Sequence, residues 1–481
     1  MSRLKLFKTQ VTRLNIKSTQ EYYLNSPSAR WLALASISIS NFVVSVTMSA
    51  VNVAVPMMAK DLSANAILVS WVPTAFLLAN AIFLLPAGRM ADIHGRKKIF
   101  LTGMTLFSVS CVLANLAPNI ELLLVTRVFQ GIGGALAFAT GLAILMSIFS
   151  SSNRGTALGI AAATLYLGLS LGPVIGGWFT ENYGWRSVFL FPVVLGFISV
   201  TMTVLRLKGE WKDDGAQKVD WYGSLVFGVW SSALYIGISL IPDPLAWILI
   251  LSGIAGAVYF YYQQLASPNP LIKFKAILQN RVFSRSLMGN LCIYSSNYPF
   301  VFLFSLYLQY IQGMSPANAG QIMVLQPLMM AIVAPISGRL SDTFEPRFIA
   351  TTGCIVMACA FALLQTIDTD TSITLIAIAL MTLGIGFGLF TTPNNNAALS
   401  AMDKERLGIG SALLNLARVS GNMIGTATVL LLVTLFIGHV QIKPPLYPAL
   451  LTLIHVALGM SCVLTIWGGW FSYSRGLVQQ T

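Results

Sequence analysis

The stretch Gly88-Arg89-Met90-Ala91-Asp92-Ile93-His94-Gly95-Arg96-Lys97-Lys98 lies between two apolar runs, at 69–88 and 99–117, and decides the fold class. Four of its residues are Lys or Arg. Each flanking run has the length of about 20 mostly apolar residues that a helix needs to cross a bilayer. A short basic segment between two such runs indicates two membrane helices joined on one side of the membrane.

The composition of the whole chain supports this interpretation. Of the 481 residues, 56% are hydrophobic and only 9% are charged, whereas a soluble protein carries about 25% charged residues. So few charges cannot cover the surfaces of water-soluble domains, which excludes a soluble enzyme, a disordered chain and a disulfide scaffold. The apolar runs are continuous and lack the alternation of a membrane β-barrel. The composition therefore predicts an all-α polytopic membrane protein.

Fourteen apolar runs are long enough to span a membrane. They lie near 31–56, 69–88, 99–117, 121–146, 155–179, 186–205, 221–241, 246–265, 286–309, 317–337, 348–367, 373–393, 408–437 and 448–472. The predicted order is a tail at 1–30, an N-terminal six-helix bundle at 31–205, a segment at 206–283 that holds linkers and the two extra helices, a C-terminal six-helix bundle at 284–472 and a tail at 473–481.

The distribution of basic residues predicts the orientation. With the N-terminus in the cytoplasm, the cytoplasmic segments hold 24 Lys and Arg residues, the opposite side holds three, and two lie within spans. Cytoplasmic loops of membrane proteins carry such an excess, so both termini are expected in the cytoplasm. The net charge of +13 then needs no nucleic-acid partner. The first 30 residues are polar and basic, so no cleavable signal peptide is expected.

The charged stretch recurs in the second half of the chain. Gly88-Arg89-Met90-Ala91-Asp92 has a counterpart in Gly338-Arg339-Leu340-Ser341-Asp342. Each copy follows an even number of predicted helices and is expected in a cytoplasmic turn. Halves repeated about an axis along the membrane normal are typical of transporters whose substrate site lies between the repeats.

Several segments carry a more specific resemblance. The 88–98 stretch resembles the loop 2–3 signature of the major facilitator superfamily, 127–134 resembles its helix 4 motif, and 168–177 resembles the helix 5 motif of its antiporters. Further matches lie at 51–56, 220–223, 280–283, 306–309 and 319–320. From about residue 31 onward, the chain resembles the fourteen-helix drug:proton antiporter, or multidrug efflux, branch. The resemblance implies a major facilitator fold, a small-molecule substrate and protons as the coupling ion.

Two groups of residues are candidates for conformational gating. In the charged stretch, glycines permit a tight turn, and Asp92 can pair with a nearby arginine or reach a helix N-terminus. The alternative is an ordinary basic loop that only fixes topology. At 168–177, glycines at four-residue spacing form a smooth face for close helix packing, which either slides during transport or is a static seam. The candidates are Gly88, Arg89, Asp92, Gly95, Arg96, Gly168, Gly172, Pro173, Gly176, Gly177, Gly338 and Asp342.

Polar residues within the spans are candidates for the substrate or proton pathway. Arg127 costs about 2.5–3.5 kcal/mol at a helix centre, so it should face a wet cavity or a polar partner, and Gln130 shares its face. The alternative is an anchor to backbone carbonyls of another helix. Polar stripes on two other predicted helices are either interhelical hydrogen-bonding groups or the lining of a water-filled path. They consist of Asn290, Tyr294 and Asn297 in one helix and of Ser411, Asn415, Arg418 and Asn422 in the other.

Further positions bear on coupling. His455 is the deeply placed side chain whose unperturbed pKa lies near neutrality, and it is interpreted either as a structural group or as a proton carrier. Relatives typically have an aspartate five residues before the asparagine of the Val-Asn-Val-Ala motif, whereas here Thr47 precedes Asn52. Threonine cannot titrate, so the usual carrier is missing, and a neutral or anionic substrate fits better. Asn394, Asn395 and Asn396 are expected to form a cap and turn.

These observations favour a secondary active transporter in the cytoplasmic (inner) membrane of a bacterium, which exports a small organic molecule by proton-coupled alternating access. The sequence has no Gly-x-x-x-x-Gly-Lys-Ser/Thr phosphate-binding loop, and we expect no cofactor, metal site or enzymatic activity. One alternative is an exporter or importer of an anionic metabolite, such as a carboxylate-type siderophore. Another is a transport-dead membrane sensor or scaffold. We expect a monomer, with accessory export proteins as an open possibility.

Overall fold

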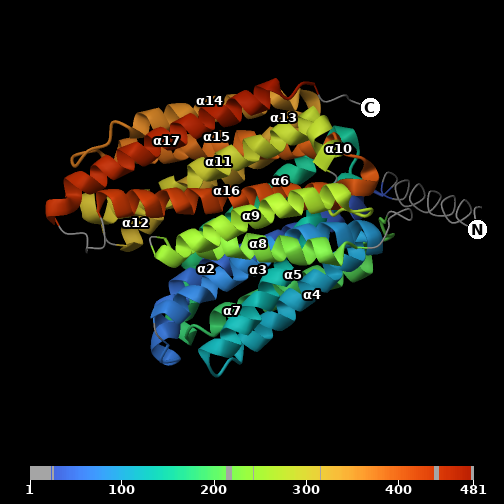
Figure 1. The fold of residues 1–481 in the computed structure, drawn as a ribbon, viewed down its shortest axis with the longest axis horizontal. Coiled ribbons are helices and arrows are strands. Elements are labelled where there is room, and N and C mark those ends of the chain that lie inside the picture. The colour runs from blue at the N-terminus through green and yellow to red at the C-terminus, as the bar shows by residue number, and fades with distance from the viewer. Residues whose placement is uncertain are drawn as a thin grey trace, which may run out of the picture. The chain divides into compact units, whose positions relative to one another are not determined.

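The protein is represented by a computed structural model that describes residues 23, 26–64, 66–212, 219–241, 243–272, 274–314, 316–437 and 444–477. Every regular element within these ranges is a helix, as Figure 1 shows. The predicted all-α class is therefore confirmed for the described residues. Most of the tail predicted at 1–30 and the end of the tail predicted at 473–481 lie outside them.

The helices have the following bounds. They are α2 (Pro27–Asp61), α3 (Ala66–His94), α4 (Arg96–Asn115), α5 (Ile120–Ile148), α6 (Arg154–Tyr183), α7 (Ser187–Arg206), α8 (Trp221–Ser239), α9 (Pro244–Ala266), α10 (Phe274–Gln279), α11 (Arg281–Leu306), α12 (Pro316–Met323), α13 (Leu325–Thr343), α14 (Pro346–Leu364), α15 (Ile373–Ser400), α16 (Leu407–Phe436) and α17 (Tyr447–Ser474). A π-helical turn, Tyr307–Ile311, continues α11, and short 3-10 turns precede α6, α16 and α17.

Fourteen helical segments of the described chain are long and apolar enough to cross a membrane. This number confirms the prediction, and each segment overlaps one predicted span. Four of the segments are composite. Arg281–Ile311 includes the π-helical turn, and Asn318–Thr343 includes most of α12 and all of α13. Ser151–Tyr183 and Pro444–Ser474 each include a 3-10 turn. The assignment of the two termini to the cytoplasm stays a prediction.

The chain divides into two compact units. The first comprises Met1–Gly228, Gln263–Lys273 and Met402–Asn415, and the second comprises Val229–Tyr262, Phe274–Ala401 and Leu416–Thr481. The first unit contains the six spans predicted for the N-terminal bundle, together with the beginnings of α8 and α16 and the end of α9. The second contains the remaining spans of the C-terminal half.

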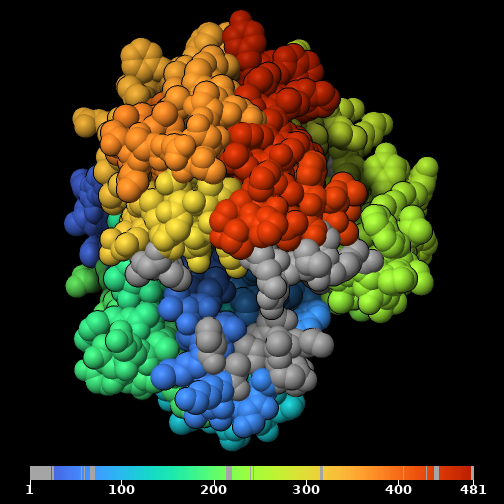
Figure 2. All heavy atoms as spheres, turned by 90° about the vertical axis from the view of Figure 1, so that its left-hand side faces the viewer, coloured from blue at the N-terminus to red at the C-terminus, as the bar shows by residue number. Residues whose placement is uncertain are grey.

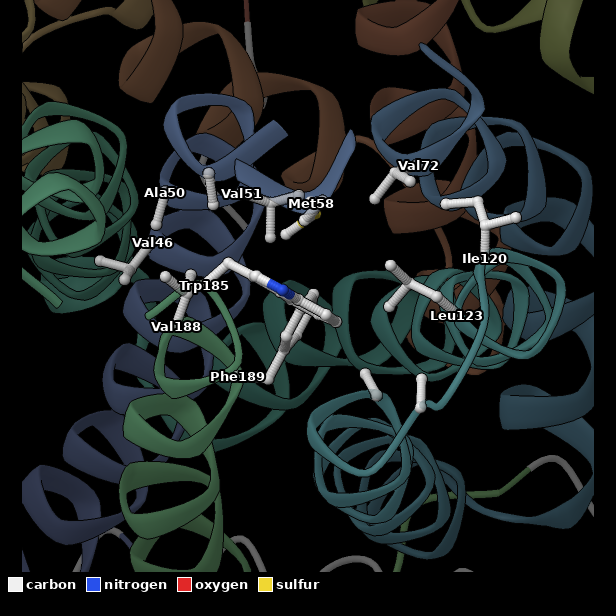
Figure 3. Packing of buried hydrophobic residues seen from close by; sticks show 13 residues of the cluster. Val46, Ala50, Val51, Met58, Val72, Ile120, Leu123, Trp185, Val188 and Phe189 are labelled. Atoms are coloured by element: carbon white, nitrogen blue, oxygen red, sulfur yellow. The ribbon is translucent and has the colours of Figure 1, made fainter. Parts of the chain in front are cut away.

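A cluster of buried apolar side chains holds several helices of the first unit together. Figure 3 shows the Trp185 indole between side chains of α2, α3, α5 and α7, with Phe189 beside it at a ring-centroid distance of 6.2 Å. Trp185 Nε1 donates a hydrogen bond of 2.9 Å to the Asp61 carboxylate, and Arg186 forms an ion pair with the same group. The hydrogen bond from Trp185, followed by that from Arg186, holds the pKa of Asp61 below its ordinary value.

The glycine face of α6 packs against α2 within the first unit. A Cβ on Gly176 would lie 2.7 Å from atoms of Ala50, and one on Gly168 would lie 2.8 Å from the Phe42 carbonyl oxygen. Any side chain at these positions would force the two backbones apart, as expected for small residues at four-residue spacing. Pro173 points away from this contact and is exposed, and a Cβ on Gly177 would meet only Val53, at 3.8 Å.

In the second unit, α17 packs against α11 and α14, while α15 packs against α13 and α14. Figure 1 shows the red α17 beside the orange α14. Close approach again depends on glycine, because a Cβ on Gly353 of α14 would lie 2.6 Å from the Gly386 carbonyl oxygen of α15.

The helices α8 and α9 form the pair that the sequence predicted as an insertion. Most of their large apolar side chains are exposed, among them Leu225, Ile248, Leu251 and Tyr262. Figure 2 shows side chains projecting from the yellow-green surface that these helices form. Such side chains belong in contact with lipid.

Two local predictions were wrong. Gly88–Asp92 was expected in a turn but forms the last turns of α3, and Gly338–Asp342 likewise ends α13. Asn394–Asn396 was expected as a cap and turn but lies inside α15, which continues to Ser400. Hydropathy marks where an apolar stretch ends, and a helix that leaves the membrane can continue because its hydrogen bonds are internal.

Candidate functional site

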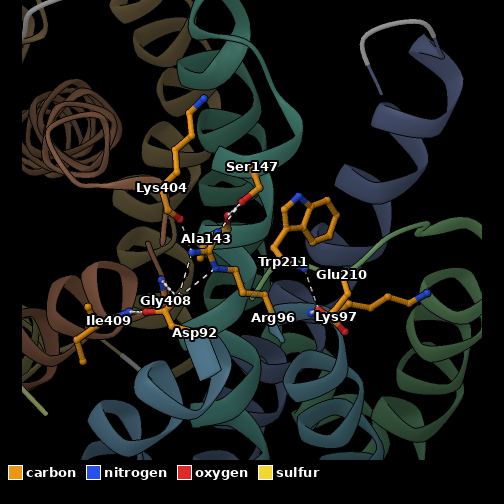
Figure 4. A network of polar contacts seen from close by, with 10 residues as sticks. All are labelled: Asp92, Arg96, Lys97, Ala143, Ser147, Glu210, Trp211, Lys404, Gly408 and Ile409. Atoms are coloured by element: carbon orange, nitrogen blue, oxygen red, sulfur yellow. Dashed lines mark hydrogen bonds and ion pairs between the residues drawn. The ribbon is translucent and has the colours of Figure 1, made fainter. Parts of the chain in front are cut away.

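The carboxylate of Asp92 holds the beginning of α16 in the first unit. Its oxygens accept hydrogen bonds from the backbone N–H groups of Gly408 and Ile409, each at 2.9 Å, as Figure 4 shows. Both belong to the first turn of α16, where N–H groups lack helical partners and the helix dipole favours negative charge. Asp92 therefore acts as the anion at a helix N-terminus.

Arg96 completes this contact from the other side. Its Nη2 lies 3.0 Å from the Asp92 carboxylate and donates a hydrogen bond of 2.6 Å to the Lys404 carbonyl oxygen, while Nη1 donates to Ser147 Oγ at 2.7 Å. Asp92 is 1% exposed and Arg96 is 3% exposed. Removing one partner of such a buried pair costs about 3–5 kcal/mol, because the other charge is left uncompensated.

Two glycines allow the close approach of helices around the Asp92 contact. A Cβ on Gly88 would lie 2.5 Å from the Ala412 side chain and 2.7 Å from the Gly408 carbonyl oxygen, so Gly88 permits α3 and α16 to touch. Gly95 has φ of 110°, a conformation that favours glycine, and it links α3 to α4. The tight turn predicted for this stretch is thus confined to Gly95.

A second carboxylate occupies the N-terminus of α4. Glu210 accepts hydrogen bonds from the backbone N–H groups of Lys97, at 2.8 Å, and Lys98, at 3.1 Å. Burial raises the pKa of Glu210, and the hydrogen bonds from the backbone oppose this effect. Arg89, the remaining candidate of this stretch, lies half-buried on α3.

Arg127 lies fully buried in the first unit and has no carboxylate partner among the described residues. Its Nε donates a hydrogen bond of 2.9 Å to the Val72 carbonyl oxygen, Nη1 bonds to Gln130, and its guanidinium carbon lies 4.7 Å from the Phe76 ring centroid. The contact with Val72 is the one that the anchor interpretation predicts. Nη2 is buried without a hydrogen-bond partner among the described residues.

The candidates of α2 do not form a shared site. Thr47 is completely buried, and its hydroxyl donates to the Val43 carbonyl oxygen of the same helix at 2.7 Å. Asn52, by contrast, is exposed. The Thr47 hydroxyl is therefore satisfied within its own helix.

In the second unit, Asn290 belongs to an amide cluster. Asn394 Nδ2 donates to Asn290 Oδ1 at 2.9 Å, and Asn290 Nδ2 donates to Asn395 Oδ1 at 3.3 Å. Arg475 Nη1 donates to Asn394 Oδ1 at 2.8 Å and to Ser286 Oγ at 3.3 Å. Arg475 is 1% exposed, and burial lowers the pKa of its guanidinium to about 10, so the group stays charged at neutral pH.

Other candidates of α11 contact different helices of the second unit. Gln326 Nε2 donates a hydrogen bond of 2.6 Å to Asn297 Oδ1. The Tyr294 ring packs edge-on against Phe387, with centroids 5.2 Å apart. Asn290 and Asn297 of this stripe thus share hydrogen bonds with side chains of other helices, and Tyr294 packs against a ring of α15.

The stripe on α16 is divided between the two units. Ser411 Oγ and Asn415 Nδ2 both donate to the Phe138 carbonyl oxygen of α5 in the first unit, at 3.2 and 3.3 Å. Arg418 belongs to the second unit and is half-buried. His455 Nε2 lies 2.9 Å from the carbonyl oxygen of Ile367, in the connection between α14 and α15, while His455 itself lies inside α17.

Three residues of these networks were missed as candidates. Glu210 and Arg475 were counted only as charges outside the spans, and Asn394 was taken for a cap. No local signal identifies Glu210, because the N-terminus that it caps lies more than 100 residues earlier in the chain. The Pro-Asn-Asn-Asn run at 393–396 was the available signal for the amide cluster. In the described part of the chain no group of three His, Cys, Asp or Glu side chains could hold a metal ion.

Fourteen spans, a repeated charged segment and buried cations define a polytopic transporter. A sequence model described as "Major Facilitator Superfamily" matches residues 37–426, and the chain belongs to this family. It is therefore a multi-pass membrane protein of a family of secondary transporters, not an enzyme.

Curated relatives and solved structures agree with this assignment. The riboflavin transporter RibZ of Clostridioides difficile is 28% identical, with 83% of this chain and 87% of that protein aligned. The multidrug efflux pump LfrA of Mycolicibacterium smegmatis is 27% identical, over 85% and 82%. The proton:xylose symporter XylE has the same fold, with a TM-score of 0.67 at 12% identity over 94% of this chain and 97% of that one.

Proposed function

We propose that this chain exports a small organic molecule across the cytoplasmic membrane of a bacterium, coupled to the inward movement of protons. The contact of Asp92 with the first turn of α16 carries the proposal. Residues Leu407–Asn415 of α16 belong to the first unit, whereas the rest of the helix belongs to the second. A carboxylate that holds the start of a shared helix can therefore bias a rocking movement of the two units.

The energetics of this contact suit a switch. Asp92 and Arg96 are both desolvated, so the gain from their attraction is offset by the loss of water. Opening the contact would expose both groups to water and return part of that loss. Two states of similar free energy are what alternating access requires.

The charges within the spans support a neutral or anionic substrate. Each acidic residue in the described spans lies within two residues of a helix end, namely Asp92, Glu121, Glu181 and Asp342. A desolvated cationic drug would find no counter-charge in the middle of these spans. Arg127 stays charged at any working pH and can bind an anion but cannot carry protons.

A second candidate substrate is a neutral planar heterocycle such as riboflavin. The similarity to a riboflavin transporter favours it, and so does the absence of acidic residues from the middle of the described spans. The same transport machinery would serve either an efflux pump or a vitamin transporter, because the substrate contacts alone distinguish them.

Transport by the purified full chain in proteoliposomes tests the proposal. With an imposed pH gradient, a labelled neutral or anionic substrate should move against its concentration gradient, and a protonophore should abolish this movement. Riboflavin and a permanent dication are the comparison substrates. Saturable transport of the dication would contradict the substrate charge, and transport that ignores the protonophore would contradict proton coupling.

The proton carrier is proposed to be His455. Its replacement, His455→Ala, should weaken the pH dependence of transport. The span-edge acid Asp220 is the alternative carrier, although its carboxylate already accepts hydrogen bonds from the Gly223 N–H and from Gln264. An unchanged pH profile in the His455 variant would move the role to Asp220 or to the substrate.

The orientation of the chain is part of the proposal. Ser151 and Asp368 are both exposed and lie in connections that the charge distribution assigns to opposite faces. Single cysteines at these two positions, in a background without the five native cysteines, should react with an impermeant reagent from opposite sides. Labelling of both from one side would contradict the predicted topology.

A further inference from the structure

The end of α17 carries arginines and aromatic rings that the proposed transport cycle does not use. The Ser474 carbonyl oxygen accepts hydrogen bonds from Arg281 Nε and Arg285 Nη1, each at 3.1 Å. Both arginines come from the first turns of α11, which packs along α17 in the second unit. A single carbonyl at a helix C-terminus thus draws two guanidinium groups together.

Exposed rings lie against Arg285 and against a third arginine, Arg347. The guanidinium carbon of Arg285 is 5.1 Å from the centroid of the Trp470 ring. That of Arg347, at the beginning of α14, is 4.6 Å from Phe348 and 5.9 Å from Tyr473. Trp470, Tyr473 and Phe348 are 58%, 56% and 50% exposed. We call Arg281, Arg285, Arg347, Trp470, Tyr473 and Phe348 the arginine–aromatic surface.

The charge of this surface is not balanced from within. Among the described residues, no carboxylate bonds to Arg281, Arg285 or Arg347. The Arg347 guanidinium contacts the rings of Phe348 and Tyr473, and its buried Nε has no hydrogen-bond partner in the described part of the chain. Guanidinium groups that no carboxylate binds present planar forks of donors, which match the oxygens of a phosphate.

The position of the surface in the span indicates the kind of anion. Trp470 and Tyr473 lie in the last turns of the span Pro444–Ser474, where exposed tryptophan and tyrosine rings settle at the level of lipid headgroups. The charge distribution assigns this end of the span to the cytoplasmic face, whose lipids carry negative charge. The arginine–aromatic surface therefore combines rings suited to the boundary between acyl chains and headgroups with guanidinium groups suited to a phosphate.

We propose that the arginine–aromatic surface is a binding site for an anionic phospholipid, with the lipid phosphate held by Arg281, Arg285 and Arg347 and its upper acyl region resting on Trp470 and Tyr473. The lipid would tie the ends of α11, α14 and α17 together on the outside of the second unit. This inference requires only that the chain lies in a membrane and does not depend on which substrate it transports.

Lipid retention by the purified full chain in a nonionic detergent tests the site. Native mass spectrometry would measure binding from an equimolar mixture of palmitoyl-oleoyl-phosphatidylglycerol and the corresponding phosphatidylcholine. The wild type should retain phosphatidylglycerol in preference. Since each cation near the membrane surface is worth about a factor of five, the double variant Arg285→Gln, Arg347→Gln should weaken this binding about thirtyfold.

A matched double variant controls for net charge. Arg206→Gln, Lys404→Gln removes two exposed cations from the same predicted face of the first unit, where no ring contact is present for either residue within the described structure. It should leave phosphatidylglycerol retention within about twofold of the wild type, because the effect belongs to a site and not to the total charge. Equal loss in both double variants would overturn the proposal.

Further variants keep the test decisive if the double variant is unstable. Arg347→Gln alone breaks no internal hydrogen bond, so it should unfold at the wild-type temperature and bind phosphatidylglycerol about fivefold less tightly. Trp470→Leu, Tyr473→Leu keeps the charges and should also weaken retention. Unchanged retention in these variants, or full displacement of the lipid by millimolar inorganic phosphate, would contradict a lipid site.

Discussion

The two copies of the charged segment form the ends of α3 and α13, and the residues around them differ between the two units. In the first unit, Asp92 is buried, pairs with Arg96 and holds the start of α16. In the second unit, Asp342 occupies the corresponding place but is only half-buried, and Pro346 stands where the first copy has Arg96. The ion pair of the first unit therefore has no counterpart at the matching positions of the second.

The second unit uses neutral amides around one buried cation instead. Asn394 accepts from Arg475 and donates to Asn290, and Asn396 donates to Ser341, the residue before Asp342, at 3.0 Å. A repeated sequence motif can thus conserve a helix end while the chemistry around it diverges. We expect the first unit to respond to changes of charge and the second to changes of hydrogen-bond geometry.

The largest effect is expected from Asp92. Asp92→Ala leaves the Arg96 guanidinium buried without its counter-charge, which costs the state that contains the pair about 3–5 kcal/mol. Asp92→Asn, which can still accept a hydrogen bond, should slow transport while leaving substrate affinity largely unchanged. Counterflow rates and substrate binding in the two variants measure these effects.

The matched control for Asp92 removes both charges together. Asp92→Asn, Arg96→Gln leaves no unpaired buried charge, so it should be more stable than Asp92→Ala. A large loss of substrate binding in Asp92→Asn would mean that the residue supports the substrate site and not the movement of the units.

Arg475 is expected to give the next largest effect. Arg475→Leu leaves Asn394 Oδ1 without its donor, which lowers the free energy of unfolding by about 1–3 kcal/mol. The same change removes a buried charge, and the desolvation cost that this avoids partly offsets the loss. Thermal unfolding in detergent should therefore show a smaller decrease than Asp92→Ala does. If Arg475→Leu were the more damaging variant, the second unit would depend on charge as strongly as the first.

Asp342 provides the direct comparison between the two copies. A half-exposed carboxylate contributes about 1 kcal/mol or less to its contacts, so Asp342→Asn should change the transport rate by at most about fivefold. The measurement is the ratio of rates for Asp342→Asn and Asp92→Asn in the same proteoliposomes. Equal losses would show that the two copies act equivalently despite their different surroundings.

The smallest effect is expected from Glu210. Burial raises the pKa of Glu210 above its ordinary value, so the folded protein holds this proton more tightly than the unfolded chain does. The stability that this proton contributes is present below the unfolded pKa and is lost as the pH rises through the folded pKa. Glu210→Gln should therefore remove this part of the pH dependence. The measurement is the unfolding temperature of the wild type and of Glu210→Gln at pH 4.5 and 7.5. An equal change between these two pH values in both proteins would contradict the prediction.

The sequence by itself determined the features that depend on near neighbours. The fourteen spans follow from local hydropathy, because a bilayer of fixed thickness requires an apolar helix of fixed length. The glycine face of α6 follows from the spacing of Gly168, Gly172 and Gly176, since every fourth residue of a helix returns to the same side. The sequence also predicted that Asp92 could pair with a nearby arginine of the charged stretch, and Arg96 is that partner.

Only the tertiary structure decided which helix ends these groups meet. Asp92 reaches an N-terminus more than 300 residues further along the chain, and Glu210 caps α4 from the linker that follows α7. Arg475, counted from sequence as a solvated charge, is buried against Asn394. Such contacts depend on how long helices end beside one another, and hydropathy carries no information about this because it is averaged along a single segment.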